Sequence, residues 1–340
     1  GGFKQSGMGR DKCLETLTTV TQTKSVWMHL GRDRPQTGRK WPVARSAGGI
    51  ARSRPSAFWG SAMTTPLVTI DQIVAAESAI AGRVLRTPAI LSPALSDLLG
   101  CRVALKLELL QKSGCFKPRG ITNRLLALSD AEKSRGLITV SGGNHGIAIA
   151  RIGKEMGIAV TVVMSNKAPA RSQARIKADG ATLLLTEDAG AAFDLADKEC
   201  AAKGLTYIHS YDDPLIIAGH GSVGREFIAD FPDLTDVLVS IGGGGLISGV
   251  AVALKAANPK IRVWGVETVG ADCMTQALAA DKPVRVAVSS IATTLAPPSV
   301  TERTLAHVKA LVEEVMLVPD AEAVEGLLTF AEDAKLWAEP

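Results

Sequence analysis

Aromatic side chains are scarce in this chain, since phenylalanine, tryptophan and tyrosine together make up 4% of its 340 residues. Its core must therefore be built mainly from alanine, valine, leucine and isoleucine. No uninterrupted apolar run reaches the roughly 20 residues that a membrane-spanning helix needs. No apolar stretch typical of a secretory signal opens the chain. The sequence thus gives no sign of a helical membrane protein or a secreted one, and we expect no membrane partner.

Cysteines are also few and scattered. The chain has five, and none forms a CxxC pair or combines with histidine at the spacing of a zinc site. An odd number of isolated cysteines does not suggest a disulfide framework, and reduced thiols are typical of the cytoplasm. We therefore predict a cytoplasmic protein.

The chain has little excess of either charge, because its net charge is only +4. Residues 1–62 carry eleven basic and three acidic side chains, so the remaining residues have a net charge of −4. A mildly acidic body offers no electrostatic reason to bind nucleic acid, and we expect none as a partner.

Residues 1–62 differ from the rest of the chain in composition. They are rich in arginine, serine and glycine, lack a steady apolar period, and hold three of the five tryptophans. We predict a basic leader that is disordered or added by cloning, with Met63 as the natural start. A basic, acid-poor organellar transit segment is the alternative.

From Met63 onward, apolar runs typical of strands alternate with patterns typical of helices. The expected strands are 102–107, 137–140, 158–164, 181–185, 236–241, 261–266 and 313–318. The expected helices are 70–81, 119–128, 144–156, 170–178, 189–203, 214–229, 245–257, 301–310 and 320–334. Such alternation predicts parallel-rich sheets covered by helices, in two α/β domains with a ligand between them.

Three short segments stand out at the starts of expected helices. SGCFKPRG, residues 113–120, places Lys117 where backbone N–H groups are unpaired and favour anions. SGGNHG, residues 141–146, offers several donors at a helix start and can hold a carboxylate. SIGGGGLISG, residues 240–249, puts four glycines between strand and helix, an arrangement suited to phosphate. A lysine near positive helix ends can form a Schiff base with an aldehyde, and pyridoxal 5′-phosphate is an aldehyde that carries a phosphate.

The glycine segment by itself also admits a dinucleotide site. Gly243, Gly245 and Ser248 form an imperfect G-x-G-x-x-G fingerprint, and Glu267 ends the next expected strand, where a ribose-binding acid would lie. A nicotinamide-dependent oxidoreductase therefore stays open as an alternative, although it assigns no role to Lys117.

Taken together and in this order, the three segments resemble those of fold-type II pyridoxal-phosphate enzymes, in particular serine/threonine dehydratases (ammonia-lyases) and serine racemase. The resemblance covers residues 63–340. It implies a two-domain fold like that of tryptophan synthase β, with the cofactor between the domains. We expect 63–135 and 213–340 to form the large domain and 136–212 the small one. A homodimer or homotetramer is also expected.

The resemblance further implies the roles of individual residues. Lys117 would form the Schiff base and act as the base at Cα. Phe116 would pack on the pyridine ring, and Asn144 would bind the ring hydroxyl. The backbone of Gly242, Gly243, Gly244, Gly245 and Leu246 would hold the phosphate. The substrate carboxylate would bind the loop of Ser141, Gly142, Gly143, Asn144 and His145.

The implied reaction is β-elimination from L-threonine or L-serine, which releases ammonia with 2-oxobutanoate or pyruvate. Racemases of this family have a second serine where this chain has Gly142, and Gly142 thus argues for a lyase. A serine racemase, a hydroxyaspartate dehydratase, a β-replacement synthase and a non-catalytic cofactor binder remain alternatives. Relatives continue beyond KLWAEP with a partner for the pyridine nitrogen, so we expect a truncated large domain.

A metal site is a further expectation from the resemblance. Metal-using members of the family bind the cation with a glutamate after the glycine loop, a backbone carbonyl and another acid. The matching positions are Glu267 and Ala271, which suit Mg or Ca. Cys273 stands where the further acid is expected, and a thiol weakens such a site.

Overall fold

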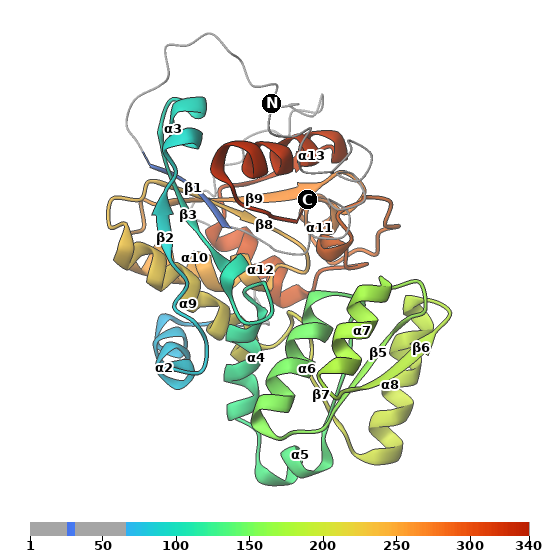
Figure 1. Ribbon diagram of the computed structural model, residues 1–340. Coiled ribbons are helices and arrows are strands. Elements are labelled where there is room, and N and C mark those ends of the chain that lie inside the picture. The colour runs from blue at the N-terminus through green and yellow to red at the C-terminus, as the bar shows by residue number, and fades with distance from the viewer. Residues whose placement is uncertain (1–25, 31–65, 340) are drawn as a thin grey trace, which may run out of the picture.

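Two β-sheets organise the protein, and the computed structural model describes residues 26–30 and 66–339 of the chain (Figure 1). The larger sheet has six strands in the order β10-β9-β8-β1-β3-β2. Their bounds in that order are Glu314–Val318, Arg262–Thr268, Asp236–Ser240, Val26–Leu30, Arg102–Lys106 and Ala89–Leu91. The strands β10, β9 and β8 run parallel, whereas β1, β3 and β2 pair antiparallel with their neighbours.

The smaller sheet is parallel throughout, in the order β6-β5-β4-β7. These strands are Thr182–Thr186, Val160–Ser165, Leu137–Val140 and Thr206–Tyr207. Successive side chains of a strand point to opposite faces. Val162 accordingly packs in a core with helix α6 (Asn144–Met156), and Val163 in another with α8 (Ala189–Lys203). Both faces are thus covered, as parallel sheets require; α7 (Ala170–Ala178) lies beside α6.

The larger sheet also packs against helices. On one face, Val237, Val239 and Val263 pack with Val250 and Leu254 of α10. The helices of this body include α2 (Ile70–Ile80), α4 (Lys117–Leu126), α9 (Pro214–Asp230), α10 (Gly245–Ala257), α11 (Cys273–Ala280) and α12 (Glu302–Leu311). Over β3, a separate core joins α3 (Pro93–Leu99) to the π-helix Phe330–Ala334 that follows α13 (Asp320–Thr329).

Helix α4 connects the two bodies. It packs against α9 of the larger body and against α6 of the smaller one, and it is followed by the short helix α5 (Asp130–Arg135) (Figure 1). Ile121 and Leu125 of α4 belong to the same buried core as Leu137 and Ile147. Residues before the expected boundary at 136 therefore contribute to the core of the smaller body, and the division into domains stays a prediction.

The expected α/β class is confirmed, and most expected elements appear within two residues of their bounds. Helices 144–156, 170–178, 189–203 and 245–257 have the expected bounds. The shorter elements β2, α3, α5, β7 and α11 were not predicted from the sequence. These have too few residues to show a clear period. Within the described residues, no helix is long and apolar enough to cross a membrane.

Residues 26–30 correct the expectation for the leader. They form β1 in the interior of the larger sheet, antiparallel to both β3 and β8. The backbone of β1 completes the hydrogen-bond ladders of two strands that would otherwise be unpaired edges. The prediction of a disordered leader is therefore wrong for these five residues. The other residues of 1–62 lie outside the described part of the chain.

Candidate active site

A cavity of about 630 Å³ contains every residue that the sequence analysis assigned to cofactor or substrate. Its wall includes Phe116 and Lys117, the loop 141–145 and the glycine segment 242–246. Residues 207–211 and 293–298 contribute to the rest of the wall. The expected site residues are far apart in the chain, yet they share one cavity between the two bodies.

Helices α4, α6 and α10 begin at this cavity, and the residue before each of them provides no side-chain cap. The residues before α4, α6 and α10 are Phe116, Gly143 and Gly244, and none of them accepts a hydrogen bond from its helix through a side chain. At α6, Ser141 Oγ accepts the N–H of Gly146, and the earlier N–H groups of that helix have no side-chain acceptor among the described residues. By contrast, α2, α9 and α12 are capped by Thr69, Asp213 and Thr301. Uncapped helix starts leave N–H groups unpaired and carry partial positive charge. The cavity is therefore suited to more than one anionic group.

The glycine segment before α10 lies too close to its neighbours for side chains. A Cβ atom on Gly243 would lie 2.3 Å from the ring of Tyr211. Gly244 has a φ of +88°, and a Cβ there would lie 2.8 Å from Thr304 Cβ. Only glycine satisfies both conditions. The result is bare backbone at the cavity wall, as a bound phosphate requires.

Lys117 is the first residue of α4 and is half-buried in the cavity wall. Its Nζ lies 4.4 Å from the centroid of the Phe116 ring. Phe116 is buried, and its ring meets that of His220 edge-on at 4.7 Å. The amine is thus held at a helix end, next to an aromatic face, inside a cavity that attracts anions.

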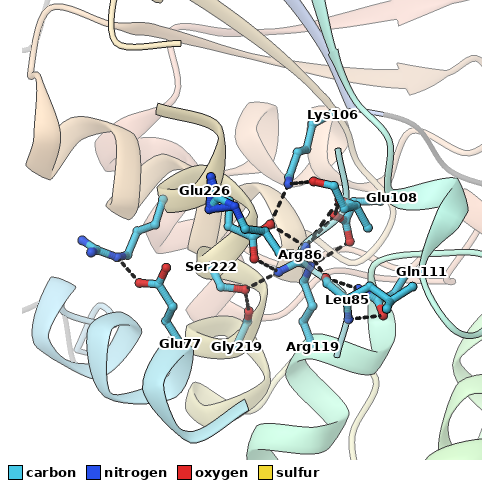
Figure 2. A network of polar contacts seen from close by, with 12 residues as sticks. Glu77, Leu85, Arg86, Lys106, Glu108, Gln111, Arg119, Gly219, Ser222 and Glu226 are labelled. Atoms are coloured by element: carbon cyan, nitrogen blue, oxygen red, sulfur yellow. Dashed lines mark hydrogen bonds and ion pairs between the residues drawn. The ribbon is translucent and has the colours of Figure 1, made fainter. Parts of the chain in front are cut away.

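A buried ionic cluster fixes α4 just behind Lys117 (Figure 2). Arg119 donates to Glu108 at 2.8 Å and to Glu226 at 2.6 Å, and Lys106 donates to Glu226 at 2.6 Å. Burial alone would lower the pKa of Arg119, but the two carboxylates hold it above its usual value. The two cations balance the two anions, as buried charges must. Arg119 therefore pairs inside the protein rather than facing the cavity.

Hydrogen bonds to the Ser141 side chain stabilise the loop 141–145. Ser141 Oγ accepts hydrogen bonds from the backbone N–H groups of Gly146 at 3.0 Å and Gly143 at 3.4 Å. His145 is buried, and its Nε2 has no hydrogen-bond partner. Burial, together with the charge of Lys117, lowers the pKa of His145 to about 3. The loop thus presents a neutral, partly unpaired wall at the start of α6.

Two further histidines, His209 and His220, line the cavity. His220 is 2% exposed, and neither of its ring nitrogens has a hydrogen-bond partner. Burial and Lys117 lower its pKa well below the usual value. His209 Nδ1 accepts hydrogen bonds from the N–H groups of Tyr211 and Asp212, and burial lowers its pKa. Both rings are therefore neutral at pH 7.

The structure does not support the expected metal site. Glu267 accepts hydrogen bonds from the N–H groups of Met274 at 2.9 Å and Thr275 at 2.8 Å, and from Thr275 Oγ1 at 2.8 Å. It caps α11, so its oxygens are not offered to a cation next to Ala271. No cluster of three potential metal ligands occurs among the described residues. The same contacts occupy Glu267 where a ribose would need it, which removes the support for the dinucleotide alternative.

Sequence reasoning missed three residues of this site. Tyr211 packs so closely against the glycine segment that Gly243 has no room for a side chain, and it donates its O–H to Ser299 O at 2.7 Å. Thr294 lies in the cavity wall, and Glu339 contacts both Thr294 and Asn144. Nothing in the sequence indicates these contacts, because Glu339 is 195 positions from Asn144.

The fold and the site together define a class of enzyme. A lysine amine, a glycine cradle for phosphate and a second anion-binding loop meet in a cavity between two α/β bodies, an arrangement that fits a phosphorylated aldehyde cofactor. The comparison with protein families identifies this cofactor. Residues 80–340 match the family described as pyridoxal-phosphate dependent enzymes, and the chain belongs to it.

Individual relatives agree with this assignment. The chain is 35% identical over 275 residues to an L-threonine ammonia-lyase of Thermotoga maritima, a match that covers 80% of this chain and 69% of the relative. The structure of maize serine racemase superposes with a TM-score of 0.76 at 33% identity, covering 80% of this chain and 83% of the other. The structure of a T.th. threonine deaminase gives 0.74 at 33% identity, covering 78% and 87%. These are all fold-type II enzymes, as expected from the sequence.

Proposed function

We propose that the protein is a pyridoxal-phosphate dependent ammonia-lyase acting on L-threonine or L-serine, and that it releases ammonia with 2-oxobutanoate or pyruvate. The observation that carries the proposal is the meeting of Lys117 with the starts of α4, α6 and α10 in one cavity. The similarity to an L-threonine ammonia-lyase supports this choice of reaction within the family.

The residues around the cavity divide the binding of the cofactor among them. Lys117 Nζ would bind the aldehyde carbon, and Phe116 would pack on the ring. Asn144 would hydrogen-bond the ring hydroxyl. The N–H groups from Gly242 to Leu246 would hold the phosphate at the start of α10. When bound, pyridoxal phosphate supplies an electron-accepting ring that stabilises negative charge at the substrate Cα.

The loop from Ser141 to His145 would bind the substrate carboxylate at the start of α6. The histidines of the cavity wall are neutral, so they would not attract this carboxylate away from the loop. Lys117 would hold the cofactor until substrate binds, and its amine would then act as the base that accepts the proton from Cα. The β-hydroxyl would leave as water with the proton taken from Cα, and hydrolysis of the released enamine would give the 2-oxo acid and ammonia.

A spectroscopic titration tests the proposal. Pyridoxal phosphate added to the purified protein should give the visible band of a lysine-bound aldehyde, which borohydride abolishes. L-Threonine should change that band and release ammonia. Lys117→Ala should lose both the band and ammonia release. Lys112→Ala, which replaces an exposed lysine five positions before Lys117, should keep both. Ammonia release by Lys117→Ala at the wild-type rate would reject the proposal.

Racemisation is the second candidate function, favoured by the similarity to maize serine racemase. Protonation from both faces of the substrate needs a second acid, and Gly142 carries none. A Cβ atom on Gly142 would lie 3.5 Å from Ala168 Cβ, which is an ordinary contact, so a serine fits there. Chiral chromatography should detect no D-serine from the wild type and a measurable amount from Gly142→Ser. Efficient interconversion by the wild type would favour the racemase instead.

We further propose that the protein is cytoplasmic and forms a homodimer or homotetramer. Exposed apolar side chains gather on the edge strand β2 and the neighbouring α3, namely Ile90, Leu91, Leu98 and Leu99. Such a patch supports self-association. Light scattering of the purified protein should give a mass of two or four chains, and a monomer would argue against this assembly.

A further inference from the structure

Glu339 reaches the cavity wall from the far end of the described chain. Its two carboxylate oxygens accept hydrogen bonds from Asn144 Nδ2 at 3.0 and 2.9 Å. One of the same oxygens accepts a hydrogen bond from Thr294 Oγ1 at 2.9 Å. No ion pair formed between described residues includes Glu339. The carboxylate is therefore held by two neutral side chains, both of which line the cavity.

This contact determines which way the Asn144 amide faces. An asparagine amide has one accepting and one donating end, and its orientation follows from its hydrogen-bond partners. An ionised carboxylate can only accept. The donating Nδ2 end must therefore face Glu339. Asn144 is the first residue of α6, so its backbone is fixed by the helix and rotation of the amide is the main freedom left to it.

We propose that Glu339 is a positioning residue that selects the group which Asn144 presents to the cofactor. The inference rests on the proposed function, in which Asn144 binds the ring hydroxyl. One N–H of Nδ2 can be shared between the two Glu339 oxygens, as a three-centre hydrogen bond, which leaves the second N–H for the ring oxygen. A donated N–H favours the ionised form of that oxygen. An amide turned the other way would present Oδ1 and favour the protonated hydroxyl.

Thr294 makes this arrangement independent of the cofactor. It lies in the short 3-10 helix Thr293–Leu295 and holds the Glu339 carboxylate from a second element. Thr294 thus orients Glu339, and Glu339 in turn orients Asn144. The Asn144 amide is set before any ligand binds, which reduces the cost of ordering the site.

Labelling with ¹⁵N-asparagine tests the contact without any cofactor. The chain contains four asparagines, so four pairs of side-chain N–H signals are expected, and Asn144→Asp assigns one pair. Glu339→Met keeps the length of the side chain but removes both acceptors, and it should shift the Asn144 pair. Glu332→Met, which replaces an exposed glutamate on the preceding π-helix, should leave that pair in place. Unchanged Asn144 signals in Glu339→Met would overturn the proposal.

Titration with pyridoxal phosphate tests the consequence. Glu339→Met should raise the dissociation constant by roughly 3- to 10-fold, the effect of one lost hydrogen bond. It should also change the pH at which the lysine-bound band changes colour. Glu339→Gln, which keeps one acceptor, should fall between Met and wild type, and Glu332→Met should match wild type. Thr294→Val should give a smaller change in the same direction, and it serves as the test if Glu339→Met does not fold.

The two proposals can fail separately. If the wild type never shows a lysine-bound band, the proposed function is wrong, and the asparagine signals still decide whether Glu339 orients Asn144. If the wild type shows the band and Glu339→Met has the same affinity and colour, the proposed function stands and the role of Glu339 is rejected.

Discussion

Two glycines of the cavity wall differ in the space that a side chain would have. Gly243 and Gly142 both line the cavity, but only Gly243 lies against another residue too closely for a side chain. The distance from an added Cβ atom to the nearest atom is 2.3 Å at Gly243 and 3.5 Å at Gly142. The two glycines therefore have different physical reasons to be present.

Gly243→Ala should damage the phosphate cradle. The added methyl would overlap the ring of Tyr211, and relief of such overpacking costs roughly 1–3 kcal/mol. We expect the affinity for pyridoxal phosphate to fall, because the backbone N–H groups must move. Gly142→Ala is the matched control and should bind the cofactor normally. Absorbance titration of both variants measures the effect, and equal affinities would contradict the explanation.

At the level of elements, α4 matters because it carries Lys117 at its first position and Arg119 one half-turn later. Arg119 joins α4 to α9 through Glu226 and Ser222, and to the segment after β3 through Glu108 (Figure 2). The position of the lysine therefore depends on a cluster that does not itself touch the cavity.

Arg119→Met should destabilise the protein strongly. It leaves Glu108 and Glu226 with less compensation in the interior, and breaking a buried pair costs roughly 3–5 kcal/mol. Denaturation by urea measures the loss. Arg151→Met removes an exposed arginine from α6 and should cost far less, since exposed pairs contribute little. Similar midpoints for the two variants would show that the buried cluster is unimportant.

Helix α11 depends on an acid for its start, and this makes stability sensitive to pH. Burial raises the pKa of Glu267 from 4.5 to about 7. The folded protein thus holds a proton that the unfolded chain releases. This contribution to stability is present below pH 4.5 and is lost as the pH rises to about 7.

Glu267→Gln removes this titration, so its stability should decline less between pH 4.5 and 7 than that of the wild type. The buried histidines act in the opposite direction, because their lowered pKa values stabilise the fold as the pH rises. The difference between the two pH profiles from urea denaturation therefore isolates Glu267. Parallel profiles would mean that Glu267 does not titrate in this range.

On the scale of the whole molecule, the larger sheet depends on a strand from the leader. Without β1, the ladder β10-β9-β8 would be separated from β3-β2. Deletion of residues 1–62 should therefore lower the melting temperature and promote aggregation through the exposed edges of β3 and β8. Deletion of residues 1–25 alone keeps β1 and is the control. An unchanged melting temperature after the longer deletion would show that the sheet does not need this strand.

Much of the fold could be read from the sequence. Helix 144–156 has the predicted bounds because glycines flank a clear apolar period, and β4 is a short apolar run bounded by turn residues. Lys117, Asn144 and the glycine segment could be placed at helix starts for the same reason. These are local properties, since they depend on residues that are neighbours in the chain.

Only the tertiary structure decided the partners of these residues. Glu267 was expected to bind a metal and instead caps α11, because the backbone N–H groups of Met274 and Thr275 fold back onto it. Glu339 meets Asn144, and Arg119 meets Glu226, across 195 and 107 positions. Such contacts depend on how whole elements cross, and no local period of the sequence records that geometry.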